Sequence, residues 1–193
     1  MNKVKEKICD KGFTYNEPYF YNNHLALRCE LGVDEDKFLE SAVNRAKEIC
    51  EIVFKGKVDC FFIDQFFYND DTDNQQLLKY KSEFLHEDIE DISIVEDDCA
   101  ETPVKITRSV FYPDRDITNE LIKENIVNHN VFHSHLVFYD NDCIVSIYDE
   151  RGLDIVFFDE DKYCEMYEKL FLYLLQYDIE VMRKKYDKLN GKK

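Results

Sequence analysis

Residues 133–159 read HSHLVFYDNDCIVSIYDERGLDIVFFD and contain three apolar runs separated by short polar turns. The first turn is Asp-Asn-Asp at 140–142, and the second is Asp-Glu-Arg-Gly at 149–152. Both turns have the length that joins neighbouring antiparallel strands. The stretch therefore predicts a three-stranded antiparallel meander.

A strand and a helix are predicted well upstream of this meander. Residues 25–31, LALRCEL, show the alternation of a strand that buries one face. Gly32 ends this strand, and Asp34 can cap a helix over 34–53. The helix is indicated by apolar residues at helical spacing, namely Phe38, Leu39, Ala42, Val43, Ala46, Ile49 and Val53. With a second apolar strand at 58–67, the chain is predicted to begin as β-α-β.

The remaining segments complete a mixed pattern of helices and strands. A short helical pattern covers 77–85, two strands are expected near 89–95 and 104–112, and Asp116 can cap a helix running toward Asn128. Asp159 or Asp161 opens a long C-terminal helix, followed by a second helical segment at 178–189. The predicted class is α+β, with a mixed, largely antiparallel sheet or sheets, packed by the helix at 34–53 and the long C-terminal helix.

The domain organisation follows from length and composition. No repeat and no linker rich in Pro, Gly or Ser divides the 193 residues, so a single domain over 1–193 is expected. Pro113 marks an alternative division into lobes 1–113 and 114–193, which would share one sheet or form two. No segment has the ~20 apolar residues of a membrane helix.

The charge and the cysteines indicate the environment and the kind of partner. A net charge of −16 disfavours direct nucleic-acid binding and favours a basic protein partner, although it also keeps a protein soluble. Seven cysteines without a C-x-x-C pair suit a reducing cytoplasm, where they serve as small buried apolar residues. The expected location is therefore cytoplasmic, away from membranes.

Two stretches resemble a known family. They are LALRCELG at 25–32 with its helix, and SIYDERGLDIVFFD at 146–159 with the helix that follows. Together they are similar to the bacterial family called domain of unknown function 3885, over about residues 21–177. This resemblance implies a mixed helix-and-sheet domain and carries no activity, cofactor or catalytic residue with it.

The YDERGLD motif places several charges around one turn. Arg151 and Asp154 are a candidate polar patch for a partner, because clustered charges on a loop can position a ligand. The alternative is a purely structural turn in which Gly152 adopts the positive φ that a hairpin requires.

Three histidines suggest a second kind of site. His129, His133 and His135 form H-x-x-x-H-x-H, and alternation places His133 and His135 on one face of a strand. A divalent metal with Asp140 or Asp149 as the carboxylate would make the protein a metal-dependent hydrolase. No HExxH signature supports this reading, and lone histidines on half-buried strands are common, so the expectation is no cofactor.

Residues 87–101 are the densest acidic stretch, with eight acids and no Lys or Arg. Glu90, Asp91, Asp97 and Asp98 are predicted to contact a basic protein and to accelerate its association. The alternative is a solvated strand edge whose charges prevent aggregation.

The leading functional hypothesis is a non-enzymatic interaction protein, such as an immunity protein that neutralises a toxin. No nucleophile elbow, P-loop or dinucleotide-binding glycine motif occurs in the chain, so the common hydrolase and nucleotide-binding classes lack support. The metal-dependent hydrolase is the alternative. A nucleic-acid-associated protein ranks last, because Lys and Arg are scattered along the chain.

Overall fold

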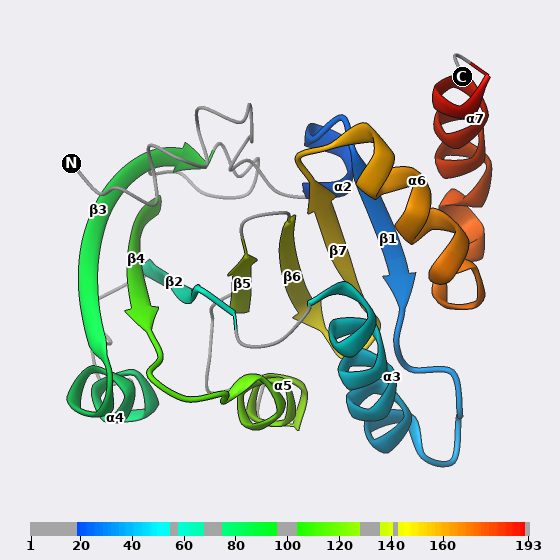
Figure 1. The fold of residues 1–193 in the computed structure, drawn as a ribbon. Coiled ribbons are helices and arrows are strands. Elements are labelled where there is room, and N and C mark those ends of the chain that lie inside the picture. Colours follow the sequence, from blue (N-terminus) through cyan, green and yellow to red (C-terminus); the bar gives the residue numbers. More distant parts are fainter. Residues whose placement is uncertain are drawn as a thin grey trace.

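The computed structural model describes most of the chain, namely residues 19–54, 58–67, 75–95, 104–127, 136–140 and 143–191. Its centre is one seven-stranded sheet in the order β1-β7-β6-β5-β2-β4-β3, in which every pairing is antiparallel (Figure 1). The strands are β1 (Ala26–Glu30), β2 (Cys60–Phe67), β3 (Leu85–Val95), β4 (Val104–Tyr112), β5 (Leu136–Asp140), β6 (Cys143–Asp149) and β7 (Gly152–Phe157). The predicted α+β class is confirmed.

The predicted C-terminal meander is confirmed as β5-β6-β7. Every residue of β7 is buried, and so are the first five of β6. This burial on both faces explains why these runs are almost continuously apolar instead of alternating. The pairing of β5 with β2 crosses the alternative boundary at Pro113, so the two halves of the chain share one sheet.

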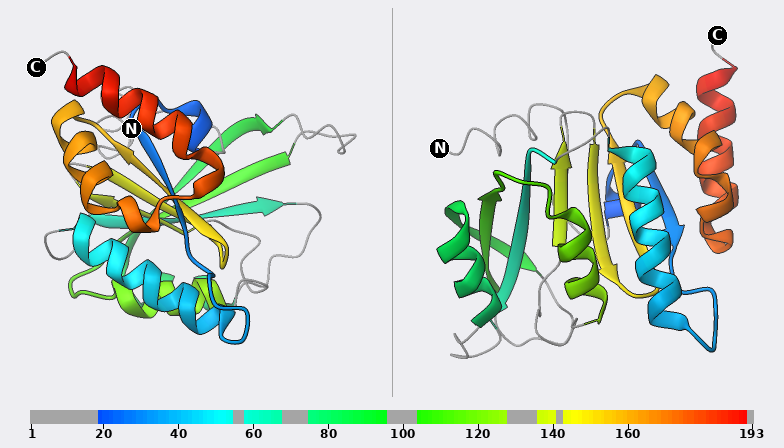
Figure 2. Two further views of the ribbon diagram at one scale, coloured as in Figure 1. Left: turned by 90° about the vertical axis from the view of Figure 1, so that its right-hand side faces the viewer. Right: turned by 60° about the horizontal axis from the view of Figure 1, so that its bottom comes forward.

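Helices lie on both sides of this sheet (Figure 2). Helices α3, α4 and α5 line one side, whereas α2, α6 and α7 lie over the other side near β1 and β7. The helices are α2 (Tyr19–Asn22), α3 (Phe38–Val53), α4 (Gln75–Glu83), α5 (Thr118–Val127), α6 (Glu160–Lys169) and α7 (Ile179–Asn190), with 3-10 turns η2 (Phe171–Tyr173) and η3 (Gln176–Asp178) between α6 and α7. None of the described helices is long and apolar enough to cross a membrane.

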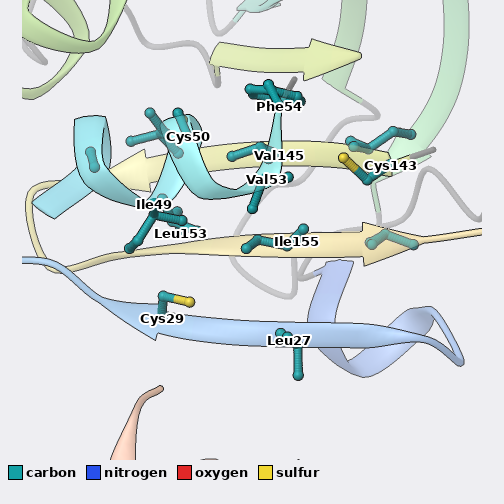
Figure 3. Close-up of a cluster of buried hydrophobic side chains, with 14 of the residues drawn as sticks. Leu27, Cys29, Ile49, Cys50, Val53, Phe54, Cys143, Val145, Leu153 and Ile155 are labelled. Carbon is teal, nitrogen blue, oxygen red and sulfur yellow. The ribbon is translucent and has the colours of Figure 1, made fainter. Parts of the chain in front are cut away.

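Helix α3 supplies much of the core, as its apolar spacing predicts from Ala42 onward, whereas Leu39 is exposed and Phe38 is half-buried. Ile49, Cys50 and Val53 point toward the side chains of Val145, Leu153 and other residues of β6 and β7 (Figure 3). Burying each large side chain contributes roughly 1.5–3 kcal/mol, so this interface anchors the helix to the sheet. The prediction that Asp34 caps this helix is wrong, because the helix begins at Phe38 with Lys37 at its N-cap. Asp34 instead accepts hydrogen bonds from the backbone N–H groups of Asp36 and Lys37 in the preceding turn.

Strands β1 and β2 are not neighbours, contrary to a simple β-α-β unit. They run in the same direction, but β7, β6 and β5 lie between them. The three strands of the C-terminal meander therefore lie between the first two strands of the chain. Strand β1 consequently pairs with the last strand of the chain.

The C-terminal helical region is confirmed and is divided into α6 and α7. Asp159 caps α6 by accepting a hydrogen bond from the backbone of Lys162 at 2.9 Å. After Lys169 the chain forms two 3-10 turns before α7 begins. The apolar positions at 170–175 therefore belong to a connecting segment beside β1 instead of to a continuous helix.

Candidate functional site

The two stretches that carry the family resemblance meet in the sheet. Arg28 on β1 lies directly opposite Asp154 on β7. The guanidinium donates two hydrogen bonds to this carboxylate, from Nε to Oδ1 at 2.8 Å and from Nη2 to Oδ2 at 3.0 Å. Both side chains are largely buried, with exposed fractions of 12% and 3%. Such a bidentate pair fixes the position of β1 relative to β7.

A second carboxylate completes the surroundings of this arginine. Asp178 Oδ2 lies 3.5 Å from Arg28 Nη1, and the Tyr21 hydroxyl donates to Asp178 Oδ1 at 3.2 Å. The backbone N–H of Phe20 donates to Asp154 Oδ2 at 3.0 Å. Helix α2, strand β7 and turn η3 therefore all converge on one cation.

Aromatic rings enclose the same guanidinium. Its central carbon lies 5.0 Å from the ring centroid of Phe20, 4.8 Å from that of Tyr21 and 5.6 Å from that of Tyr148. Cation–π contacts of this kind are stronger where water is excluded. We call Arg28, Phe20, Tyr21, Tyr148, Asp154 and Asp178 the Arg28 cluster.

The electrostatics of the Arg28 cluster favour a permanently charged arginine. Burial alone would lower the pKa of Arg28, but the hydrogen bonds and charge of Asp154 outweigh it and raise this pKa. Burial, and then the charge of Asp154, raise the pKa of the Tyr148 phenol. Partial burial and the charge of Asp178 raise the pKa of Tyr21. Both phenols therefore stay protonated at neutral pH, and the cluster joins α2, β1, β7 and η3.

The C-terminal segment covers the outer side of β1. The N–H of Leu175 donates to the carbonyl of Arg28 at 2.9 Å, and Leu174 forms an isolated antiparallel bridge with Cys29. The N–H of Arg28 in turn points at the sulfur of Met182 at 3.4 Å. The backbone of this edge strand is therefore engaged on both sides.

The YDERGLD turn separates the two residues of the predicted polar patch. Arg151 is exposed and forms an ion pair with Asp149, with Nε 2.8 Å from Oδ2. Asp154 is 2% exposed and is committed to Arg28. Asp154 is therefore unavailable to a partner, because α2 and η3 cover the face of the sheet on which it pairs with Arg28. The exposed patch reduces to Arg151 and its neighbours.

The reason for glycine at position 152 differs from the prediction. Its φ does not lie in the left-handed region, so a positive φ is not what the turn requires. A Cβ here would instead lie 2.7 Å from Tyr148 Cζ and 2.8 Å from the carbonyl oxygen of Cys29. Gly152 therefore allows β7 to approach β1 closely beneath the Tyr148 ring.

The predicted acidic stretch begins on β3, the strand at the opposite edge of the sheet. Glu87 and Asp88 are exposed, and Glu90 and Asp91 follow on the same strand. Asp88 accepts hydrogen bonds from Lys81 at 2.7 Å and from Ser109 at 2.6 Å. Burial would raise the pKa of Asp88, but these two hydrogen bonds and the charge of Lys81 lower it overall. Asp97 and Asp98 lie outside the described residues.

The histidine hypothesis falls mainly outside the described part of the chain, where His129, His133 and His135 all lie. Within the described residues, no group of three or more His, Cys, Asp or Glu side chains is arranged to hold a metal ion. Asp149, one proposed carboxylate, is paired with Arg151.

The described cysteines are free thiols buried in the core, as the sequence analysis predicts; they are Cys29, Cys50, Cys60, Cys143 and Cys164. Burial raises the pKa of Cys50 and of Cys60 to about 12. These thiols are therefore protonated and unsuited to nucleophilic catalysis.

Sequence reasoning missed the role of Arg28 and of Asp178. The period of 25–31 places Arg28 on the face opposite Leu27 and Cys29, and the structure covers that face with α2 and η3. The partner of Arg28 lies 126 residues away. The available signal was a basic residue, Arg28, in one largely apolar strand and an acidic residue, Asp154, in another. This signal becomes informative only when the pairing of the two strands is known.

No curated protein and no solved structure matches the chain. A family model described as domain of unknown function (DUF3885) matches residues 6–178, a span that includes Arg28, Asp154 and Asp178. The chain therefore belongs to the DUF3885 family.

Proposed function

We propose that this protein is a non-enzymatic interaction module that binds a basic protein partner, in the manner of an immunity protein that neutralises a toxin. The observation that carries this proposal is the position of the acidic stretch. Its first part forms β3, the terminal strand of the sheet, with Glu87 and Asp88 exposed. An acidic strand at a sheet edge presents both charge and backbone to another protein.

The net charge of the whole chain supports the same role. At −16, the protein attracts cationic surfaces over distances comparable to the Debye length, about 8 Å at physiological salt. Such steering raises association rates and falls with ionic strength. The same charge repels the phosphate backbone of nucleic acids.

The Arg28 cluster is consistent with a binding module. Its two carboxylates are paired with Arg28, and burial together with the charge of Asp154 raises the pKa of the Tyr148 phenol. Buried clusters of this kind hold segments in place. The cluster would thus support a rigid scaffold whose edge makes the contacts.

The test is affinity capture from the producing cells with a matched pair of variants. Glu87→Lys with Glu90→Lys reverses charge on β3, whereas Glu180→Lys with Asp187→Lys makes the same net change on α7, at the other end of the molecule (Figure 1). We expect a basic protein to be captured by the wild type and by the α7 variant, and to be lost from the β3 variant and at high salt.

An immunity role has its own readout. The captured protein should be toxic when expressed alone and harmless when co-expressed with this chain. Capture of an acidic protein, or equal losses from both double variants, would contradict the proposed function.

A further inference from the structure

Strand β3 is a long edge strand whose first part pairs regularly with β4. It spans eleven residues, and its pairing with β4 is in register from Leu85 to Asp91 before an irregularity that ends at Val95. Within the described part of the chain, β3 pairs with β4 alone. Among the described residues, no strand therefore lies beside the other side of β3 over the roughly 20 Å from Leu85 to Asp91.

The two edges of the sheet differ in this respect. Leu174 and Leu175 lie along β1 and form a bridge and a hydrogen bond with its backbone. No described segment does the same for β3. Edge strands of this kind are the sites at which extended peptides add to a sheet.

The charge of β3 indicates which kind of segment can pair with this edge. Its sequence, LHEDIEDISIV, has four acids and no Lys or Arg, and the acids fall within the part that is in register with β4. A second copy of this chain is disfavoured, because pairing β3 with β3 would bring like charges together. An extended segment bearing Lys or Arg complements the edge instead.

We propose that the partner contributes an extended basic segment that adds to the sheet as a further strand beside β3. This inference rests on the proposed function and specifies its mode of binding. Backbone hydrogen bonds between the segment and β3 hold the two strands together, and the segment's cationic side chains lie beside the carboxylates of β3. The length of the regular edge limits the paired part to about the span from Leu85 to Asp91.

Amide hydrogen exchange provides a direct test on the full chain. The amides of an edge strand alternate, since every second N–H donates to the neighbouring strand and the others point outward. In the free protein, we expect slow exchange at every second residue of β3 and fast exchange at the residues between them. The probe is a synthetic peptide as long as β3 in which lysine and threonine alternate.

Strand addition predicts a specific change when this probe is added. Exchange should slow by at least about tenfold at the outward amides of β3, because they become hydrogen-bonded to the peptide. The control is the same peptide with a methyl group on every backbone nitrogen, which keeps its charge and loses its donors. It should bind at least about tenfold more weakly and leave the outward amides in fast exchange.

The outcomes separate this inference from the proposed function. If both peptides bind equally and the outward amides stay fast, strand addition is overturned, whereas binding of a basic ligand survives. If neither peptide binds at low salt, the inference is overturned and the proposed function loses support as well.

A pair of single variants tests whether the acids of β3 select the peptide. Glu87→Lys should weaken binding of the unmethylated peptide about threefold to tenfold, and Asp187→Lys, an equal change of charge on α7, should leave it within about twofold. Equal weakening by both variants would assign the effect to the net charge of the protein. It would overturn the inference that the acids of β3 recognise the basic peptide.

Discussion

Strands β1 and β3 are the two edges of one sheet, and they differ in length, in charge and in what lies beside them. The β1 edge is short, is covered by the segment that follows α6 and is held by the Arg28 cluster. The β3 edge is long and carries exposed acids. Natural sheets protect their edges either by covering them or by charging them. A segment that covers an edge uses the N–H and C=O groups of that edge in hydrogen bonds. Charged side chains leave these groups available to another strand.

The largest effect is expected at the covered edge. Asp154→Ala leaves Arg28 mostly buried with only the more distant Asp178 as a counter-ion, so we expect a loss of about 3–5 kcal/mol in the free energy of unfolding. Denaturant unfolding measures this loss. Asp154→Asn, which retains an acceptor oxygen, should lose less.

Arg151→Ala is the matched control for this first prediction, because it removes a charge from the same motif at an exposed position. Its effect should stay within about 0.5 kcal/mol. A loss below about 1 kcal/mol for Asp154→Ala would show that the buried pair does not hold the β1 edge.

A smaller loss is expected where β7 approaches β1. Gly152→Ala places a Cβ against the Tyr148 ring and the carbonyl of Cys29, which should reduce the free energy of unfolding by about 1–3 kcal/mol. The measurement is again denaturant unfolding. Gly191→Ala, near the end of α7, is the comparison and should cost less, because its new Cβ meets only the carbonyl oxygen of Asp187, at 3.0 Å.

The background variant Tyr148→Phe distinguishes the cause of that loss. Removing the hydroxyl should relieve part of the cost of Gly152→Ala, because the hydroxyl is among the atoms that the new methyl group meets. An unchanged cost in this background would assign the loss to the contact with the Cys29 carbonyl oxygen instead.

The smallest effect is expected at the charged edge, through Asp88. Its pKa in the folded protein lies below the ordinary value of 3.8, so its stabilising contribution is present above that value and is lost as the pH falls through the folded pKa. Asp88→Asn should lower stability at neutral pH by less than about 1 kcal/mol, since the carboxylate is partly exposed.

The pH dependence of the difference between wild type and Asp88→Asn checks this assignment. The difference should vanish in acid, and Lys81→Met, which removes the charge and one of the two hydrogen-bond donors, should give an intermediate curve. A difference that grows as the pH falls would contradict the sign of the shift.

Local elements of this fold were predictable, and their long-range pairing was not. The apolar spacing of α3, the turns of the β5-β6-β7 meander and strands β3 and β4 follow from periodicity and turn residues. The insertion of the meander between β1 and β2 leaves no local trace, because neighbouring segments normally pair. The break after Lys169 was hidden for a related reason, since its apolar residues serve β1 instead of continuing the helix.

The candidate site was partly predictable for the same reasons. The acids of residues 87–91 are visible in the sequence, but their place at the end of the sheet requires the strand order. The inward direction of Asp154 depends on Arg28, which belongs to a distant strand. Gly152 suggested a turn conformation, while its role depends on the approach of Cys29 and Tyr148.

The pairing of the first strand with the last has a consequence for synthesis on the ribosome. Arg28 can form its ion pair only after Asp154, which is 126 residues further along the chain, has been synthesised. At about 5–20 residues per second, this separation corresponds to roughly ten seconds of translation. During that interval, Leu27 and Cys29 lack the strand with which they pair in the folded protein. Newly made protein should therefore become protease-resistant only after β7 has emerged from the exit tunnel.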